Sequence, residues 1–548
     1  MSFYQLVRRE MQGSLTRLAI ASSIGGLSTT LILASINAGA QAADQGTKSL
    51  WGAATFVIAL ILFIQIQQYL LITTTAEIGA IVHKVRVRLM NYVRRSELLP
   101  LERIGRAQIV TAITMETTTL TQASTTLAFS VQNGILLILV TLYVAYLSLL
   151  AFVICILIIA FGIAISQLKA RQLTSKLSEA ATWENRLYDR LSDMLDGFKE
   201  VRLNRPRSDE LFEHIVEVSR AAANLKINTQ SETFRRMVFL QSSLYMMLGS
   251  VAFVVPAIGG GLGEGTITKA VTALVFIVGS CFGLIQSIPL VAAANAAADR
   301  IERLEAQLKK AVGTSYADTI EPRTGFTSIE MKGVEFSYVD RWSSTVFTVG
   351  PLDFTLNRGD LVIVTGGNGS GKSTFMKLLV GFYKPDFGAI RVDGVLVTDS
   401  TYDVYRSLFT AVFPDYHLFH RLYGIDNPDA AEIDRLLTQF QLVGKTALTD
   451  GEFRTVDLSS GQRKRLALIV SLLEKRPILL LDEWAADQDP EFRHKFYMEL
   501  LPALHSAGIT VVAISHDDRY IEEMNVPIRK IRMDEGQFVE QHSVESGL

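Results

Sequence analysis

The C-terminal half of the sequence contains Leu361-Val-Ile-Val364, followed by Gly366-Gly-Asn-Gly-Ser-Gly-Lys-Ser373 and an apolar run over residues 374–380. This order predicts a strand, a glycine-rich loop and a helix. Glycines let backbone N–H groups converge on phosphate oxygens at the start of the helix. The sequence therefore predicts an α/β P-loop domain whose phosphate-binding residues are Gly366, Gly367, Asn368, Gly369, Ser370, Gly371, Lys372, Ser373 and Thr374.

The chemistry of phosphate transfer assigns separate roles to four side chains. Lys372 is expected to reach the β- and γ-phosphates as a catalytic residue, and the Ser373 hydroxyl is expected to ligate Mg²⁺. A second apolar run, residues 478–481, predicts a buried parallel strand that ends in Asp482 and Glu483. Ligands of α/β sheets bind beyond such strand ends. We therefore expect Asp482 to hold Mg²⁺ and Glu483 to act as the base for an attacking water.

Two further segments carry polar residues that suit a nucleotide site. The apolar run 509–514 leads to His516, and this place at a strand end favours contact with the γ-phosphate over a purely structural role. Ser459, Ser460, Gly461 and Gln462 begin a predicted helix with free N–H groups that can bind an anion. The residues themselves leave open whose phosphate these groups bind.

The N-terminal half contains five long stretches without Asp, Glu, Lys or Arg, at residues 18–43, 49–76, 117–168, 237–263 and 270–298. About 20 apolar residues cross a bilayer, and a charge at the centre of such a helix costs about 2.5–3.5 kcal/mol. The 52-residue stretch has room for two helices. We predict an all-α membrane domain with six transmembrane helices, at about 18–43, 49–76, 122–144, 148–168, 237–260 and 270–294.

Charge is distributed unevenly between the two halves. The net charge of −2 is the sum of +7 over residues 1–325 and −9 over residues 326–548. A composition with 49% hydrophobic and 20% charged residues excludes a disordered or acidic-tail protein. The acidic nucleotide half argues against a nucleic-acid partner. Both cysteines, Cys155 and Cys281, lie in apolar runs, so neither a disulfide scaffold nor a zinc site is expected.

Basic residues also predict the orientation in the membrane. Arg8, Arg9 and Arg17 precede the first span, and seven Lys and Arg residues follow the second one between residues 84 and 106. The positive-inside rule places both regions, and with them the N-terminus and the nucleotide domain, in the cytoplasm. The basic start also imitates a secretory signal, but its apolar run exceeds the 7–15 residues of a signal core. The predicted domains are a transmembrane domain at 1–310, a linker at 311–325 and a nucleotide-binding domain at 326–548.

Taken together, these motifs resemble those of ABC transporters along the whole chain. Leu458–Gln462 resembles the LSGGQ signature, residues 478–482 with Glu483 resemble the Walker B strand, and His516 resembles the switch histidine. Six helices before one nucleotide domain resemble an exporter-type (type IV) half-transporter. The segment Trp484-Ala-Ala-Asp-Gln-Asp489-Pro490 further resembles the cyclic-peptide exporter subfamily of bacteria, whose members include exporters linked to pyoverdine precursor, syringomycin and microcin.

The resemblance implies a partner and additional site residues. In this family two nucleotide domains pair head to tail, so a second half-transporter is needed, and a homodimer with two composite ATP sites is the simplest closed arrangement. Tyr338 matches the aromatic residue that stacks on adenine, and Asp489 matches the D-loop aspartate. Contacts between the halves are expected near residues 98–108 and within 216–232.

One departure from the family concerns the Q-loop, where Pro414 replaces the usual Gln. Our hypothesis is that the adjacent Asp415 acts near Mg²⁺ instead of the Gln, and the alternative is a solvent-exposed loop acid.

The function implied by the resemblance is ATP hydrolysis with Mg²⁺, coupled to export of a peptide-like compound across the bacterial inner membrane. The cargo classes are a cyclic peptide, a siderophore precursor or a peptide antibiotic. A lipid flippase, a siderophore importer and an ATP-gated channel or sensor with little turnover are the alternatives. Pro414 slightly favours the channel, whereas Glu483 and His516 oppose it. The spans contain no charged ring that selects an ion, which counts against an ion pump.

Overall fold

The structure is a computed structural model that describes residues 3–10, 14–44, 46–47, 49–168, 170–258, 266–313, 321, 323–339, 346–425 and 428–544. The chain forms two compact units, Met1–Leu89 with Ala107–Glu305, and Met90–Arg106 with Ala306–Leu548. Most of the predicted linker, residues 314–320 and 322, lies outside the described residues.

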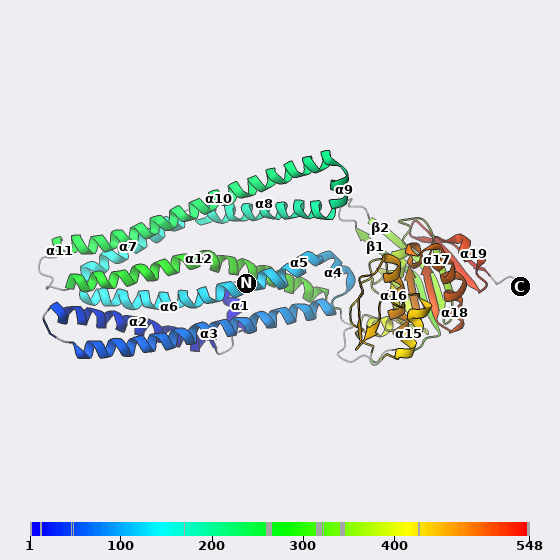
Figure 1. The fold of residues 1–548 in the computed structure, drawn as a ribbon, viewed down its shortest axis with the longest axis horizontal. Coiled ribbons are helices and arrows are strands. Elements are labelled where there is room, and N and C mark those ends of the chain that lie inside the picture. Colours follow the sequence, from blue (N-terminus) through cyan, green and yellow to red (C-terminus); the bar gives the residue numbers. More distant parts are fainter. Residues whose placement is uncertain are drawn as a thin grey trace. The chain divides into compact units, whose positions relative to one another are not determined.

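The described part of the first unit is helical (Figure 1). Its elements are α1 (Phe3–Glu10), α2 (Ser14–Asp44), α3 (Leu50–Arg95), α5 (Arg106–Thr111), η1 (Ala112–Glu116), α6 (Thr117–Leu147), α7 (Leu149–Leu168), α8 (Ala170–Asp196), α9 (Phe198–Leu203), α10 (Arg205–Gly249), η2 (Ser250–Val254), α11 (Val255–Ile258) and α12 (Thr266–Ala311).

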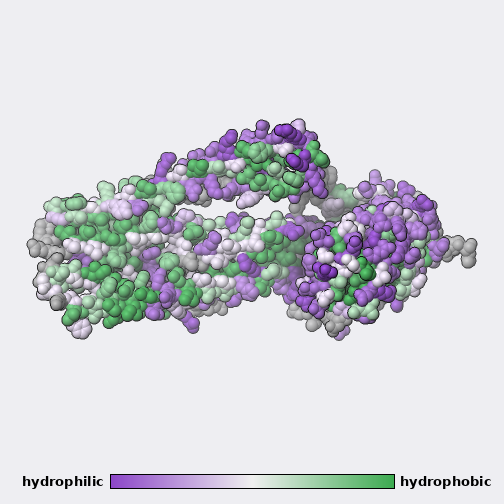
Figure 2. Space-filling view, viewed as in Figure 1, coloured by the Kyte–Doolittle hydropathy of each residue, from purple (hydrophilic) through white to green (hydrophobic). Residues whose placement is uncertain are grey.

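Five helical segments of the described chain are long and apolar enough to cross a membrane: Thr16–Ala43, Leu50–Arg95, Arg106–Leu147, Arg205–Ile258 and Thr266–Ala311. A shorter apolar helix, Leu149–Phe161, covers most of the predicted span 148–168. Large apolar side chains such as Trp51 and Ile58 are exposed on these helices, and Figure 2 shows hydrophobic side chains over much of this unit. Five predicted spans thus coincide with such segments, and the count of six stays a prediction.

Small and apolar side chains form the buried core of the helical unit. Val140 of α6, Met247 of α10 and Ala273 of α12 belong to one cluster and are fully buried. A bidentate ion pair joins Glu116 of η1 to Arg300 of α12, with oxygen–nitrogen distances of 2.5 and 2.8 Å. The shared cluster thus packs α6 with α12, and the ion pair connects α12 to η1, which directly precedes α6.

The second unit is built on a six-stranded sheet with the order β12-β11-β3-β10-β9-β6. Its strands are β3 (Leu361–Thr365), β6 (Phe409–Val412), β9 (Ile478–Asp482), β10 (Thr510–Ile514), β11 (Ile528–Asp534) and β12 (Gln537–Val544). Every neighbouring pair is parallel except β11 with β12. All residues of β3, β9 and β10 are buried, as the apolar runs predict for strands covered on both faces.

A second sheet is antiparallel, with the order β2-β1-β4-β5. Its strands are β1 (Ser328–Val339), β2 (Val346–Asn357), β4 (Phe387–Val392) and β5 (Val395–Leu396), and β7 (Leu448–Thr449) pairs with β8 (Glu452–Phe453) in a short ribbon. The helices of this unit are α4 (Leu98–Ile104), α13 (Lys372–Leu379), α14 (Tyr402–Arg406), α15 (Ala430–Gln439), α16 (Ser460–Leu473), η3 (Trp484–Asp487), α17 (Pro490–Lys495), η4 (Phe496–Leu500), α18 (Leu501–Ser506) and α19 (Asp518–Glu523).

Two apolar clusters cover opposite faces of the six-stranded sheet. Leu361 and Ile363 of β3 belong to one cluster, and Val362 and Val364 belong to the other, as side-chain alternation requires. Trp484, two residues after the end of β9, is 1% exposed and is among the largest fully buried side chains of the described residues. The carboxyl ends of the parallel strands are therefore held by a rigid core on both sides.

Candidate functional site

The loop between β3 and α13 has the glycine-dependent shape that the sequence predicts. Gly366, Gly369 and Gly371 have φ angles of 147°, 79° and 100°, a region that favours glycine. A Cβ atom on Gly366 would lie 2.1 Å from the carbonyl oxygen of Met533. The Lys372 ammonium donates hydrogen bonds to the carbonyl oxygens of Gly366, at 3.1 Å, and Gly367, at 2.8 Å. The loop is thus closed over its own lysine at the N-terminus of α13.

Asp482 lies at the end of β9 in a state that suits a cation. Both carboxylate oxygens are buried, and neither has a hydrogen-bond partner of standard geometry among the described residues. Burial raises the pKa of Asp482, the Ser373 hydroxyl, Lys372 and Lys464 act to lower it, and the neighbouring Glu483 raises it. Because an unpaired buried carboxylate is unfavourable, the donor set of Asp482 and Ser373 fits a divalent metal ion such as Mg²⁺.

Glu483 and His516 are brought together by adjacent parallel strands. The register of β9 and β10 pairs Asp482 with Ile514, so that the residues after each strand meet at the same edge of the sheet. The His516 Nε2 atom lies 3.2 Å from the Glu483 Oε1 atom. Both side chains are partly open to solvent, as a base that receives a water molecule requires.

Ser459 and Gln462 form a capping box at the start of α16, as the N-cap interpretation of this segment predicts. The Gln462 N–H donates to the Ser459 hydroxyl, and the Ser459 N–H donates to the Gln462 side-chain oxygen. Ser460 and Gly461 occupy the first turn, and a Cβ atom on Gly461 would lie 2.9 Å from the Asp487 carbonyl oxygen. The remaining N–H groups of this turn are oriented for an anion.

The other predicted residues lie at separate places around the strand ends. Tyr338, near the end of β1, is 37% exposed and packs edge-on against Phe347 at a ring distance of 5.9 Å. Asp489 caps α17 and forms an ion pair with Arg465 at 2.5 Å. Asp415 is exposed in the loop after β6, beside Pro414. Its action near Mg²⁺ stays a prediction.

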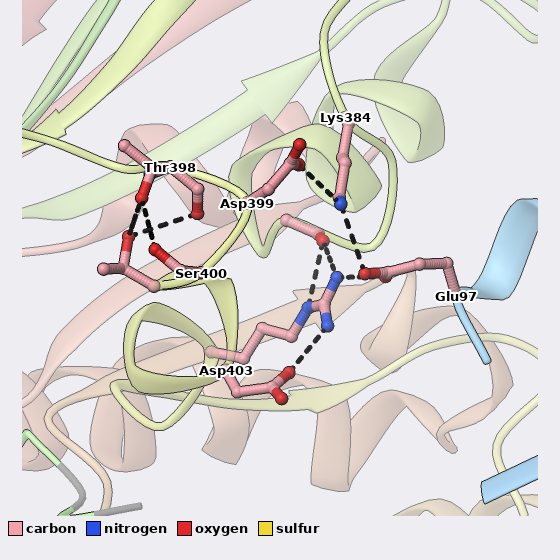
Figure 3. Close-up of polar contacts among 9 residues, drawn as sticks. Glu97, Lys384, Thr398, Asp399, Ser400 and Asp403 are labelled. Atoms are coloured by element: carbon pink, nitrogen blue, oxygen red, sulfur yellow. Dashed lines mark hydrogen bonds and ion pairs between the residues drawn. The ribbon is translucent and has the colours of Figure 1, made fainter. Parts of the chain in front are cut away.

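The structure adds a polar junction around Glu97 that no sequence motif predicts. Glu97 directly precedes α4. Its carboxylate forms an ion pair with the Arg406 guanidinium and a second one, at 3.4 Å, with the Lys384 ammonium (Figure 3). Arg406 also donates to the carbonyl oxygen of Gly381, at 2.7 and 3.0 Å, two residues beyond the end of α13. The junction thus connects α4 to the C-terminal end of the phosphate-loop helix.

A second contact strengthens the same junction. Glu102 of α4 accepts a hydrogen bond from the Tyr383 hydroxyl at 2.8 Å and from Lys377 at 3.2 Å. Glu102 lies in the segment 98–108, but it belongs to the same unit as Lys377 and Tyr383. The contacts between the halves that the resemblance implies, near residues 98–108 and within residues 216–232 of α10, therefore stay predictions.

Comparisons with known proteins agree with this geometry. Residues 349–486 match the family described as ABC transporter. The chain is 35% identical over 442 residues to the "ATP-binding protein SyrD" of Pseudomonas syringae pv. syringae, and the alignment covers 77% of each chain. It is 30% identical over 228 residues to the "Probable syringafactin export ATP-binding/permease protein SyfD" of Pseudomonas syringae pv. syringae (strain B728a), over 38% of this chain and 33% of that protein.

A solved structure of similar fold is a bacterial Atm1-family ABC exporter with ATP bound. Its TM-score is 0.75 at 18% identity, over 98% of this chain and 95% of that chain. The likeness is one of fold, and it extends over both the helical region and the nucleotide domain of this chain.

Proposed function

The chain belongs to the ABC transporters, and from that premise we propose that it exports a peptide-like compound from the cytoplasm, driven by ATP hydrolysis. The observation that carries the proposal is the identity with SyrD over 77% of both chains, an alignment of 442 residues that is too long for the nucleotide domain alone and therefore extends into the helical part. The description of SyfD as a probable syringafactin export protein supports the direction of transport. The segment Trp484–Pro490, with its resemblance to cyclic-peptide exporters, supports a cyclic peptide, siderophore precursor or peptide antibiotic as cargo.

The proposed chemistry follows from the positions of the side chains. The phosphate loop and Lys372 bind the phosphates of ATP, and Tyr338 stacks on the base. Ser373 and Asp482 would hold Mg²⁺, which neutralises phosphate charge when bound. Glu483 accepts the proton of the attacking water. His516, 3.2 Å from Glu483, orients that carboxylate and faces the γ-phosphate.

A second copy of the chain completes each site in this proposal. The chain has one phosphate loop and one signature segment, and the exposed N-terminus of α16 suits a phosphate that its own loop does not hold. We therefore propose a homodimer in which Ser459, Ser460, Gly461, Gln462 and Asp489 face the nucleotide of the partner. The homodimer lies in the bacterial inner membrane with its N-termini and nucleotide domains in the cytoplasm.

The test is transport into inside-out proteoliposomes that contain the purified chain. The probes are a labelled cyclic peptide, a labelled linear peptide, an iron-free siderophore and a fluorescent phospholipid. We expect ATP-dependent accumulation of a peptide probe, absent when Glu483→Gln replaces the parent. ATP-dependent movement of the phospholipid alone, or ATP-dependent loss of preloaded siderophore, would instead support the flippase or importer.

A further inference from the structure

Lys464, one turn into α16, has a buried side chain whose contacts lie on the catalytic segment. Its side chain is 7% exposed. The ammonium donates to the backbone carbonyl oxygen of Glu483 at 2.8 Å and forms an ion pair with Asp487 at 2.8 Å. In the reverse direction, the Trp484 ring N–H donates to the Lys464 carbonyl oxygen at 2.9 Å. The start of α16 is therefore bonded to the turn after β9 through both its backbone and its side chain.

The backbone of Glu483 explains why such a bond matters. Glu483 has φ 49° and ψ 38°, a left-handed conformation that is unfavourable for a residue with a Cβ atom. Its N–H donates to the Ile514 carbonyl oxygen at 3.2 Å, and its carbonyl accepts from Lys464. Strained backbone persists only where surrounding contacts determine it. Both contacts are thus needed to hold the turn that presents the Glu483 carboxylate to His516.

Neighbouring contacts run between the same two segments. Arg465 donates to the Gln488 side-chain oxygen at 2.8 Å and pairs with Asp489. The Gln488 amide donates to the Gly461 carbonyl oxygen at 3.2 Å. Hydrogen bonds and ion pairs therefore connect residues 461–465 to residues 483–489 at several points. Among these contacts, that of Lys464 is the one made to the backbone of Glu483.

We propose that Lys464 is a positioning residue that holds Glu483 in its reactive conformation and connects it to the signature segment. This rests on the proposed function, in which the signature segment faces the nucleotide of the partner while Glu483 acts on the nucleotide of its own chain. A shift of α16 when the partner's nucleotide binds would then reach Glu483 through one ammonium group. Each ATP site thereby senses the other through the interior of a single nucleotide domain.

The test compares four variants of the full-length protein in lipid nanodiscs. Lys464→Met removes both bonds, Lys464→Arg keeps the charge, and Asp487→Asn removes only the ion pair, at a side chain that is 49% exposed. The matched control is Lys475→Met, which removes a lysine that pairs at 3.0 Å with Glu432 and follows the end of α16. The measurements are kcat and KM for ATP, the affinity for a fluorescent ATP analogue, and hydrogen exchange of residues 483–487 without nucleotide.

We expect Lys464→Met to lower kcat by about tenfold or more, since a 1 Å misplacement of a catalytic group costs up to about 10²-fold. KM and the affinity for the ATP analogue are expected to stay within about twofold of the parent values. The kcat of Lys464→Arg is expected to lie between those of Lys464→Met and the parent. Asp487→Asn should lower kcat less than Lys464→Met does, and Lys475→Met should leave it unchanged. Exchange of residues 483–487 accelerates only in the Lys464→Met and Asp487→Asn variants. The proposal is overturned if residues 483–487 of Lys464→Met exchange at the parent's rate. It is also overturned if the kcat of Lys464→Arg is as low as that of Lys464→Met. A parent without turnover contradicts the proposed function instead, and the exchange measurement still decides the role of Lys464.

Discussion

Replacing Glu97 by Gln tests the junction between α4 and the nucleotide domain without changing the size of the side chain. The substitution removes the negative charge that Arg406 and Lys384 share. Arg406 keeps its bonds to Asp403, at 2.9 Å, and to the Gly381 carbonyl, so the nucleotide domain itself is expected to remain folded. The effect is therefore expected to fall on α4.

The exposed fractions of the three side chains determine how much free energy the substitution is expected to cost. Glu97, Arg406 and Lys384 are 15%, 21% and 32% exposed, so the charges are only partly screened by solvent. A hydrogen bond to a charged group contributes about 1.5–3 kcal/mol, and partial exposure reduces this to about 1–2 kcal/mol. Since about 1.4 kcal/mol is a factor of ten in an equilibrium constant, opening of α4 becomes about 5–30 times more frequent.

Hydrogen exchange of the α4 amides measures this opening directly. We expect the amides of residues 101–104, which follow Pro100 and begin with the Leu101 N–H bond to the Glu97 carbonyl oxygen, to exchange about 5–30-fold faster in Glu97→Gln. The control is Asp209→Asn in α10, which removes a carboxylate from an exposed pair with Arg205 at 4.0 Å and is expected to change nothing. Exchange of α4 within twofold of the parent in Glu97→Gln would refute the assigned role of the junction.

Three further substitutions test the nucleotide site and its support. Gly366→Ala places a Cβ atom 2.1 Å from the Met533 carbonyl oxygen at a φ of 147°. Titration with a fluorescent ATP analogue should therefore show that binding is lost. Affinity equal to that of the parent would contradict the loop geometry. Tyr338→Ala should weaken binding of the same analogue by about 1–3 kcal/mol of base stacking, and equal weakening by Tyr338→Phe would argue against stacking. Trp484→Ala empties a fully buried site and should destabilise the nucleotide domain by about 3–5 kcal/mol; a loss below about 1 kcal/mol in denaturant unfolding would show that the core tolerates the cavity.

The parts of the site that sequence predicts well are those encoded by contiguous residues. The spacing of glycines before Lys372 predicts a phosphate-binding loop. The apolar runs of β3, β9 and β10 predict strands that are buried on both faces, as they are in the structure. Parallel pairing then places Asp482, Glu483 and His516 at one edge. No long-range information is needed beyond the direction of the strands.

Contacts between residues that are far apart in the sequence cannot be predicted from motifs in this way. Glu97 and Arg406 are 309 positions apart, and neither belongs to a motif whose spacing demands the other. Lys464 follows the signature as one of three consecutive basic residues, a pattern that predicts a solvated helix face. Only the fold reveals that its side chain turns inward to Glu483.

Helix ends in the membrane unit show a different limit. The charge-free stretch ends at residue 76, yet α3 continues to Arg95. Its buried residues Ile78, Val82, Val85 and Leu89 recur at helical spacing, so the signal for the extension lies in periodicity rather than in missing charges. Absence of charge locates where lipid contacts a helix, whereas amphipathic spacing locates where the helix continues outside the membrane.

Glu483, beside His516 and next to Asp482, is the residue on which ATP-driven transport by this chain is proposed to depend. Steady-state ATPase activity of the purified protein in lipid, compared with Glu483→Gln, tests this dependence most directly. We predict Mg²⁺-dependent turnover in the parent and a loss of about 10²–10⁴-fold in Glu483→Gln, the usual contribution of a general base, with ATP binding retained. A parent without turnover would show that the chain is not an ATP-driven pump, and a Glu483→Gln variant that hydrolyses ATP at the parent's rate would show that Glu483 is not the base.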